Sequence, residues 1–410
     1  MNTKLSLLLT MAALAVIIGC KPKSDDELMA KAKKIHSHIL SIDTHTDTPF
    51  WFHREEFDFS GEDENNRAKV NLKKMSTGAL DAVFLAVFIG QDDRTPEMYE
   101  TVHKEASDIF NAIHSTANRH ADKATIALAS KDAYQIKKEG KKALFIGIEN
   151  GYPIGKDLGN LSEFYNLGAR YLTLCHTRNN DICDSSTDPE GAEHNGLSHF
   201  GYDVVRELNR LGMLVDVSHI SDSSFYQALR ASKVPVFASH SNARSVCDNP
   251  RNLTDDMIVK LAERGGVIQV CLLSSYVKPD EPNPVRDSAY HELFKKYNHF
   301  KDLSPEVRKE AIEAWYAIDE VFPPVLATVS DLVDHIDHIV KIAGIDYVGI
   351  GSDFDGGGAL DDCRDAGQMI NITVELLKRG YSESDIEKIW GKNFLRVFEQ
   401  AEQYAQSMKQ

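Results

Sequence analysis

Short apolar runs alternate with helical segments along most of this 410-residue chain. Most of the runs are apolar at successive positions rather than at every second position. There are eight of them: Ile39–Ile42, Ala79–Phe88, Ala143–Ile148, Arg170–Cys175, Met213–Ser218, Val234–Ser239, Gly266–Leu272 and Tyr347–Gly351. Continuous runs of this length are typical of parallel strands that are covered on both faces. The pattern therefore constrains the chain to an α/β fold.

Helical patterns separate these runs. One extends from Pro96 to His120 with apolar residues three and four positions apart, and others precede the fourth to seventh runs at 160–167, 201–211, 221–231 and 253–262. Eight strand–helix alternations predict a closed (β/α)8 barrel, or TIM barrel. The main alternative is an open doubly wound sheet, but the eight units and the absence of a glycine-rich phosphate loop favour closure.

One connection is much longer than the others. It extends from Ser274 to Ile345 and contains a proline-rich start, a helical pattern at Pro305–Ile318 and a second one at about 326–343. We interpret residues 274–325 as a lid-like insertion between strands 7 and 8, followed by the seventh barrel helix. Residues 31–410 are then expected to form a single domain with a helical tail at Ser382–Met408.

The first twenty residues resemble an export signal. An apolar segment from Leu5 to Ile18 follows one positive charge and is too short for a comfortable membrane span. Ile17-Ile18-Gly19-Cys20 resembles a bacterial lipobox, in which the cysteine is lipidated and becomes the new N-terminus. The alternative is an ordinary signal peptide with a chance cysteine.

The lipobox interpretation predicts a lipoprotein signal peptide at 1–19 and a lipidated tether at 20–30. The protein would be exported and attached to a membrane through Cys20. By the same resemblance, the absence of Asp directly after Cys20 points away from retention in the inner membrane. An outer-membrane lipoprotein is therefore expected.

Charge and cysteine content exclude some classes of protein. The net charge of −16 argues against nucleic acid as a partner, because phosphate binding needs a basic face. An exported chain permits disulfides, but the mature chain has an odd number of further cysteines, so at least one would be free or paired outside the chain. No Cys-x-x-Cys pair occurs, which argues against a thiolate zinc site. These cysteines are Cys175, Cys183, Cys247, Cys271 and Cys363.

Most of the predicted strands are followed by a side chain that can bind a metal or titrate. Each alone could be a polar residue at the start of a loop. Together they are notable because the carboxyl ends of the strands form the active face of a TIM barrel. The residues are His45 and Asp47 after the first run, Glu149 after the third, His176 after the fourth, His219 after the fifth, His240 after the sixth and Asp353 after the eighth.

This set of side chains predicts a hydrolytic metal site. Histidine and carboxylate ligands without cysteine suit zinc or another first-row divalent ion. Four histidines and three carboxylates exceed what one tetrahedral ion takes while keeping an open position, so two ions fit better. Glu149 could bridge two ions roughly 3.5–4 Å apart, and a hydroxide between them would be a nucleophile at neutral pH. By contrast, Asp334–His338 is interpreted as the solvated face of a helix.

Six motifs, in this order, resemble the membrane (renal-type) dipeptidases, which are dinuclear zinc peptidases of the amidohydrolase-like barrel type. The resemblance extends from about Asp43 to Asp355. It implies a zinc-dependent dipeptidase, tolerance of a D-residue at the C-terminal position of the substrate, and a homodimer. The motifs are Asp43-Thr44-His45-Thr46-Asp47, Gly147-Ile148-Glu149-Asn150-Gly151, Tyr171-Leu172-Thr173-Leu174-Cys175-His176, Asp216-Val217-Ser218-His219, Ala238-Ser239-His240-Ser241 and Gly349-Ile350-Gly351-Ser352-Asp353-Phe354-Asp355-Gly356.

The resemblance also implies the metal ligands. His45 and Asp47, with Glu149, would hold one zinc ion. Glu149, His219 and His240 would hold the other. The His-x-Asp opening departs from the His-x-His of many other amidohydrolases, and Glu149 takes a place often held by a modified lysine. Both departures favour the dipeptidases over that wider group.

Catalytic and substrate-binding roles follow from the same resemblance. Glu149 would bridge the metals, and His176 would stabilise the tetrahedral oxyanion and contact the substrate. Arg251 would clamp the terminal carboxylate of the substrate, for which a guanidinium is suited. Asp353 would bind substrate and carry the proton from water to the leaving amine.

Two other functions remain open. The first is another metal hydrolase of the amidohydrolase type that acts on a cyclic amide, a lactone or a phosphoester. The second is a non-catalytic binding lipoprotein that keeps an inactive barrel. The complete set of candidate metal ligands argues against this second function. Arg251 distinguishes the first alternative from a dipeptidase, because only a substrate with a free carboxylate needs it.

Overall fold

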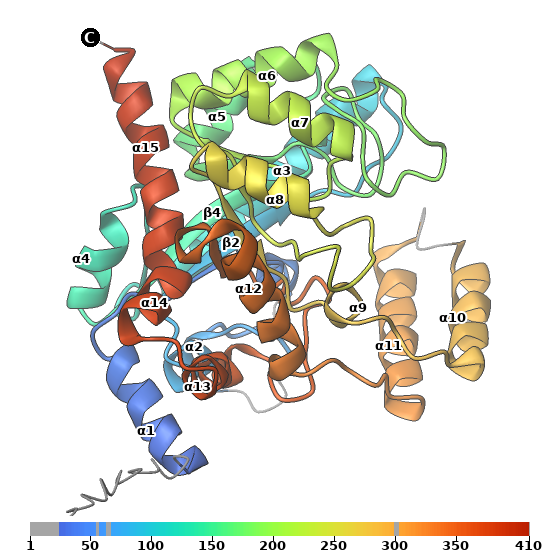
Figure 1. Cartoon of the computed structure of the whole chain (residues 1–410). Coiled ribbons are helices and arrows are strands. Elements are labelled where there is room, and N and C mark those ends of the chain that lie inside the picture. The colour runs from blue at the N-terminus through green and yellow to red at the C-terminus, as the bar shows by residue number, and fades with distance from the viewer. Residues whose placement is uncertain (1–23, 55–56, 63–66, 299–302, 410) are drawn as a thin grey trace, which may run out of the picture.

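The chain forms a parallel barrel surrounded by helices, as predicted (Figure 1). The structure is a computed structural model and describes residues 24–54, 57–62, 67–298 and 303–409. The barrel strands follow the order of the sequence: β1 (Ile42–Thr46), β2 (Ala82–Phe88), β4 (Lys142–Glu149), β5 (Ala169–Thr173), β6 (Leu214–Asp216), β7 (Phe237–Ala238), β8 (Val267–Val270) and β9 (Val348–Ile350).

The barrel closes where β1 meets the segment that follows β9. The Asp353 amide donates to the carbonyl of His45 at 3.0 Å, and the Asp47 amide donates to the carbonyl of Phe354 at 2.8 Å. Closure therefore makes the first barrel strand, β1, a neighbour of the segment that follows the last one, β9. It also brings two predicted site residues, Asp47 and Asp353, side by side.

The predicted bounds of the first strand are wrong. The strand is β1 at Ile42–Thr46 rather than Ile39–Ile42. The amide of Ile39 donates to the carbonyl of Ile35, so Ile39 continues the end of a helix and is not available for strand pairing. A short additional strand, β3 (Ala124–Ile126), pairs with the start of β4 outside the barrel order and was not predicted.

The helices surround the barrel, and several begin at the polar cap that the sequence provides. The side chains of Thr95, Ser198, Ser221 and Thr254 each accept a backbone amide three residues later. The outer helices are α2 (Leu72–Thr77), α3 (Pro96–Arg119), α4 (Asp132–Lys138), α5 (Gly159–Asn166), α6 (His199–Leu211), α7 (Asp222–Ala231), α8 (Asp255–Glu263), α12 (Val329–Ala343), α13 (Ile370–Lys378), α14 (Glu383–Glu387) and α15 (Asn393–Ser407).

The folded domain begins earlier than residue 31. Helix α1 extends over Asp25–His36, is capped by Ser24 and packs against α13. Residues 25–30 therefore belong to the fold and not to a tether, because Leu28 is buried there. The signal peptide and Cys20 lie outside the described residues, and their assignment stays a prediction. No helix in the described part of the chain has the length and apolar character needed to cross a membrane.

An aromatic layer fills the barrel on the side opposite the predicted site. Phe84 stacks on Phe145 with ring centroids 4.7 Å apart, and Tyr171 packs edge-on against Phe237 at 5.5 Å. Phe394 and Phe398 of α15 close this layer from below. These residues are fully or almost fully buried, so the layer gives the site a dry and closely packed floor.

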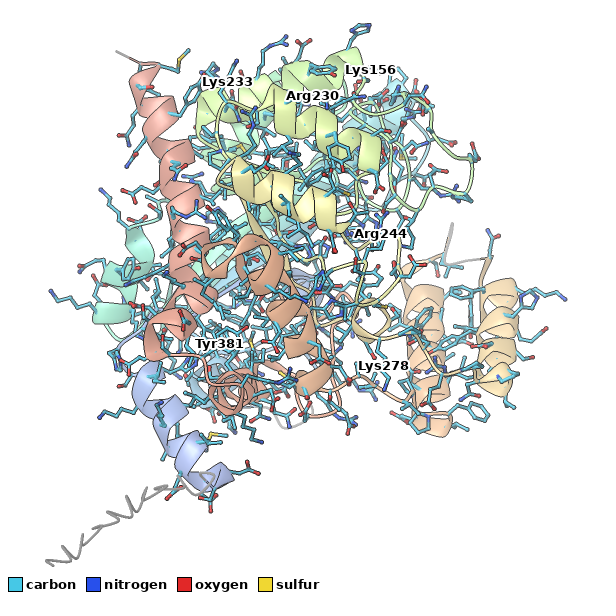
Figure 2. The ribbon with its side chains drawn as sticks, in the orientation of Figure 1. Lys156, Arg230, Lys233, Arg244, Lys278 and Tyr381 are labelled. Carbon is cyan, nitrogen blue, oxygen red and sulfur yellow. The ribbon has the colours of Figure 1, made fainter. Side chains whose placement is uncertain are left out.

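The long connection contains a helical hairpin beside the barrel (Figure 1). It begins with α9 (Ser274–Val277) and continues as α10 (Pro284–Lys296) and α11 (Pro305–Val321). The two longer helices bury Leu293 and Ala311 in a small core of their own. Lys278 follows α9, where the chain leaves the barrel for the hairpin (Figure 2). The predicted lid function of this insertion stays a prediction.

Two expectations about individual side chains have clear outcomes. His335 is not on a solvated face, because it is fully buried in α12 and its Nδ1 accepts the amide of Ala243. Asp334 on the same helix does face solvent.

The further cysteines are all buried and free in the described structure: Cys175, Cys183, Cys247, Cys271 and Cys363.

Candidate functional site

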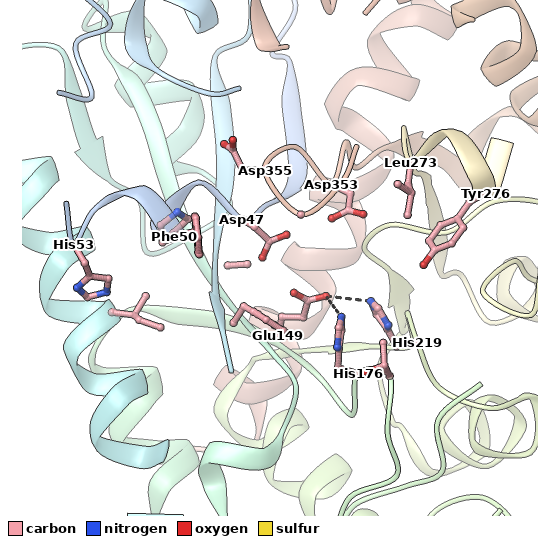
Figure 3. Close-up of a pocket in the computed structure, with 16 residues that line it drawn as sticks. Asp47, Phe50, His53, Glu149, His176, His219, Leu273, Tyr276, Asp353 and Asp355 are labelled. Carbon is pink, nitrogen blue, oxygen red and sulfur yellow. Dashed lines mark ion pairs between the residues drawn. The ribbon is translucent and has the colours of Figure 1, made fainter. Parts of the chain in front are cut away.

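A cavity of about 630 Å³ lies where the barrel strands end (Figure 3). The side chains predicted from the strand ends meet there, although they are far apart in the sequence. Asp47, Glu149, His176, His219 and Asp353 line the cavity wall. Two further predicted ligands, His45 and His240, have 0% and 1% of their surface exposed and lie beneath that wall.

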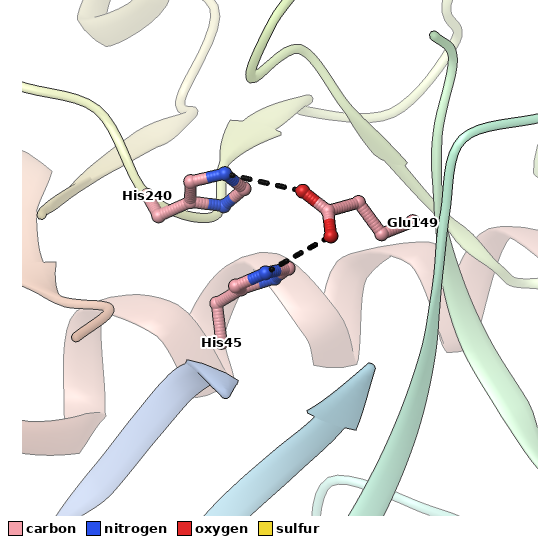
Figure 4. A group of neighbouring side chains, drawn as sticks. All are labelled: His45, Glu149 and His240. Carbon is pink, nitrogen blue, oxygen red and sulfur yellow. Dashed lines mark ion pairs between the residues drawn. The ribbon is translucent and has the colours of Figure 1, made fainter. Parts of the chain in front are cut away.

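Glu149 is the centre of the cluster. It is the last residue of β4, and its Oε1 lies 3.1 Å from Nε2 of His219 and 3.5 Å from Nε2 of His240. Its other oxygen, Oε2, lies 3.5 Å from Nε2 of His45, so the carboxylate faces a histidine on each side (Figure 4). Asp47 Oδ2 lies 3.5 Å from the same His45 nitrogen. All five predicted metal ligands are thus brought together.

Several site residues have an unusual backbone conformation. His219, Asp353, Asn150 and Asp355 have φ values of 71°, 61°, 77° and 69°. Residues other than glycine rarely adopt this left-handed region, and such residues gather at functional sites. The conformation turns the chain sharply after β4, β6 and β9. These turns aim His219 and Asp353 into the cavity instead of continuing the strand direction.

His45 and His240 are each held by a partner at Nδ1, whereas Nδ1 of His219 is buried without a hydrogen-bond partner. Tyr171 OH lies 2.8 Å from Nδ1 of His45. Ser239 Oγ lies 2.7 Å from Nδ1 of His240 and donates its only hydrogen to Asp216 Oδ2 at 2.6 Å. Ser239 must therefore accept from His240, which places the hydrogen of that ring on Nδ1. The Nε2 atom of His240 is left with a lone pair directed into the cluster, as in metal-binding histidines.

Gly147 makes room for the partner of His45. A Cβ atom at this position would lie 2.0 Å from Cζ of Tyr171, which no packing could accommodate. Glycine in the middle of β4 therefore allows the Tyr171 ring to stand inside the barrel and reach His45. The Gly-Ile-Glu sequence thus contributes both a predicted ligand, Glu149, and the space for a supporting side chain.

The donor atoms of the cluster fit a divalent metal. Nε2 of His219 and Nε2 of His240 lie only 2.8 Å apart, and burial lowers the pKa of both rings well below the usual range, which favours their neutral forms. Nε2 of His45 and Oδ1 of Asp47 are buried without a hydrogen-bond partner. Buried polar atoms without a partner are costly, and a bound cation would give both of them one. The nitrogen and oxygen donors suit zinc and related ions.

His176 and Asp353 lie on the open side of the cluster. Burial, assisted by the charge of Arg251, lowers the pKa of His176 to about 3, so the ring is neutral at pH 7. Burial and the neighbouring Asp47 carboxylate raise the pKa of Asp353 well above its usual range. A neutral imidazole can donate to a developing oxyanion, and a carboxyl group with a raised pKa can transfer a proton.

Arg251 is buried beside the cluster without a carboxylate partner among the described residues. Only 4% of its surface is exposed, and its Nε atom has no hydrogen-bond partner. One terminal nitrogen donates to the carbonyl of His240 at 3.3 Å, and the guanidinium carbon lies 5.3 Å from the Tyr276 ring centroid. A buried guanidinium without a counter-ion is costly unless a ligand supplies the negative charge.

The sequence did not reveal other residues of the cavity. Asp355 accepts from Thr48 Oγ1, Trp51 Nε1 and the Lys69 amide at 2.7–2.9 Å, and so joins the segment after β1 to the loop after β9. Asp355 stands in the last of the six motifs, but the sequence alone assigned it no role. Tyr276 carries no signal at all, because it lies in the irregular long connection.

Comparison with known proteins gives a consistent result. The sequence model of one family, described as membrane dipeptidase (peptidase family M19), matches residues 29–410. The chain is 31% identical over 401 residues to the dipeptidase verJ of Clonostachys rogersoniana, and the match covers 94% of this chain and 90% of that protein.

Two solved structures have the same fold. The probable dipeptidase PvdM from Pseudomonas aeruginosa is 30% identical with a TM-score of 0.79, and the match covers 92% of this chain and 99% of that one. A metallopeptidase from Rhodobacter sphaeroides, liganded with a phosphinate mimic of the dipeptide L-Ala-D-Ala, is 19% identical with a TM-score of 0.71. That match covers 88% of this chain and 99% of the other.

Proposed function

Because this chain belongs to the membrane dipeptidase family (peptidase family M19) and is therefore a metallodipeptidase, we propose that it uses two zinc ions to hydrolyse dipeptides. His45, Asp47 and Glu149 would hold one ion. Glu149, His219 and His240 would hold the other. The buried atoms of His45 and Asp47 that lack a hydrogen-bond partner, and the short distance between His219 and His240, support this assignment.

The bound ions would supply an activated water molecule and polarise the peptide carbonyl. The chain itself performs the remaining steps. His176, held neutral by burial, donates its Nε2–H to the carbonyl oxygen as negative charge develops there. Asp353 takes a proton from the attacking water and delivers it to the leaving amine.

Arg251 is the observation that carries the substrate assignment. Its buried guanidinium lacks a negative partner among the described residues and lies next to the metal cluster. A free C-terminal carboxylate one residue beyond the scissile bond would supply that charge. A cyclic amide or a lactone would leave the guanidinium unpaired, so these alternatives receive no support from the site.

A panel of dipeptides tests the proposed function. The protein loaded with zinc should hydrolyse L-L dipeptides, a chelator should abolish the activity and added zinc should restore it. L-D dipeptides belong in the panel because the family resemblance implies tolerance of a D-residue at the C-terminal position. A solved metallopeptidase of the same fold also binds an L-Ala-D-Ala mimic. Failure of the metal-loaded protein to hydrolyse any dipeptide would overturn the assignment.

Attachment to a membrane belongs to the same proposal. The sequence Ile17-Ile18-Gly19-Cys20 supports processing before Cys20 and lipidation of its thiol, with the domain exported and held at the outer membrane. Mass spectrometry of the mature N-terminus and a Cys20→Ser variant test this, because the variant should be released into the soluble fraction. The proposed homodimer rests on family resemblance alone, and light scattering of the domain from residue 24 onward tests it.

A further inference from the structure

Several apolar side chains line the active-site cavity. Pro49 and Phe50 come from the 3-10 turn η1 (Thr48–Trp51), Ala86 and Phe88 from β2, and Ile109 from α3. The Phe50 and Phe88 side chains are large, yet 50% and 38% of their surfaces are exposed. Exposed aromatic rings in a cavity gain free energy when an apolar ligand covers them.

The two ends of the cavity are chemically different. Figure 3 shows Tyr276 and Leu273 at one end and Phe50 and His53 at the other, with the metal cluster between them. Arg251 lies against Tyr276, so the carboxylate of a bound dipeptide belongs at the Tyr276 end. The N-terminal residue of the dipeptide then extends towards Phe50.

Phe88 gives a second, independent reference point. Its ring contacts the His176 ring edge-on, with centroids 4.8 Å apart. In the proposed function His176 donates to the carbonyl of the scissile bond, and in a dipeptide that carbonyl belongs to the N-terminal residue. The side chain attached to the same residue therefore lies beside Phe88.

Charged groups at this end are already engaged. The Asp355 carboxylate accepts three hydrogen bonds within the protein, so it offers little to a basic side chain. The Arg54 guanidinium stacks over Trp51 and Phe50, with its carbon 4.3 Å and 5.2 Å from the two ring centroids. An acidic side chain would also meet the nearby carboxylates of Asp47 and Asp353. The environment favours an apolar side chain.

We propose that Phe50, Phe88 and Ile109, which all line the cavity, form a subsite for the side chain of the N-terminal residue, and that the enzyme prefers dipeptides whose first residue is aromatic or large and aliphatic. This inference rests on the proposed function, because it assumes that Arg251 binds the C-terminal carboxylate. It adds the substrate class, which the family alone does not give.

Steady-state kinetics with dipeptides of the form X-Ala test the subsite. The ratio of kcat/KM for Phe-Ala to that for Ala-Ala should be about ten or more in the wild-type enzyme, because an apolar pocket discriminates at that level. Phe50→Ala and Phe88→Ala should each lower this ratio, and the double variant should bring it close to one. Tyr134→Ala, which removes an aromatic ring of 48% exposure on α4, is the matched control and should leave the ratio unchanged.

A variant that gains activity is also needed, because a loss of activity could come from misfolding alone. Phe50→Asp should raise the kcat/KM for Lys-Ala relative to Phe-Ala, which a damaged protein cannot imitate. A wild-type ratio of one or less, or a preference that the Phe50 and Phe88 variants leave intact, overturns the subsite while the dipeptidase function stands. No hydrolysis of any dipeptide overturns both.

Discussion

The Nε2 atoms of His219 and His240 face each other at 2.8 Å. Hydrogen bonding through Ser239 fixes the hydrogen of His240 on its other nitrogen, so a lone pair points at His219. A hydrogen on Nε2 of His219 would make this contact a hydrogen bond, whereas a bound cation would take both nitrogens as ligands. The pair is therefore placed to serve the proposed metal site.

Metal removal should weaken the folded state as well as abolish activity. An ion at a hundred times its dissociation constant contributes about 2.7 kcal/mol to the free energy of unfolding. Loss of two ions should therefore lower Tm by several degrees. Elemental analysis of the purified protein should find two zinc ions per chain, and calorimetry with and without chelator measures the stability. A metal content well below two with full activity would contradict the two-ion site.

Arg251→Ala should raise KM for dipeptides by about 10²-fold or more, because it removes the only proposed partner of the substrate carboxylate. Arg251→Lys should recover part of the loss, since a lysine supplies the charge without the planar fork. Arg230→Ala, which removes an exposed arginine from α7 (Figure 2), serves as the control. Equal KM values for Arg251→Ala and wild type would show that Arg251 does not bind the substrate carboxylate.

Asp353→Asn should lower kcat by about 10²–10⁴-fold while zinc content stays the same. Asparagine tolerates the positive φ of 61° at this position, so the backbone is preserved and only proton transfer is lost. The measurement is kcat together with elemental analysis of the same preparation. An activity within tenfold of the wild type would remove Asp353 from the proton pathway.

Tyr171→Phe should lower the affinity for one of the two metal ions by about 10–100-fold, as expected when the partner of a metal-bound histidine is removed. The ring and its packing against Phe237 remain, while the hydroxyl group 2.8 Å from His45 is lost. Titration with a chromogenic chelator measures the two affinities, with Tyr134→Phe as the control. A change confined to Tm, with both affinities intact, would make Tyr171 a packing residue only.

His36 should make stability depend on pH. Burial lowers the pKa of its ring from 6.5 to about 4, although the hydrogen bond between Nδ1 and the carbonyl of Ala79 acts in the opposite direction. Nε2 lies 2.7 Å from Thr373 Oγ1. Between these pH values the unfolded chain binds a proton that the folded chain does not. The stability contributed by the neutral ring is therefore complete above pH 6.5 and is lost as the pH falls towards 4.

Urea unfolding at pH 7 and pH 5 measures this contribution. The wild-type protein should lose about 2 kcal/mol more than His36→Gln over that interval. Because the wild-type protein and His36→Gln share all other titrating groups, the difference between their losses isolates the contribution of His36. The same loss in both proteins would contradict the assignment.

The sequence predicted the barrel, and the strand-end residues that the structure brings together, because both depend on local patterns. A buried parallel strand needs a continuous apolar run, and a predicted ligand such as Glu149 or His240 stands within a few residues of a strand end. The first strand was misplaced because Ile39 is apolar for another reason, its packing at the end of α1. Phe50 and Tyr276 were missed because they line the cavity only after distant loops come together in the fold. No local sequence pattern indicates which loops will do so.

The aromatic floor beneath the site has a consequence for shortened chains. Phe394 and Phe398 of α15 complete the packing around Phe84, Phe145 and Tyr171, and β9 closes the barrel only shortly before them in the chain. His45 and Asp47 come first among the predicted ligands in the chain, yet the packing beneath them depends on a helix near its C-terminal end. A chain that lacks α15 should therefore lack an ordered site, wherever the protein folds.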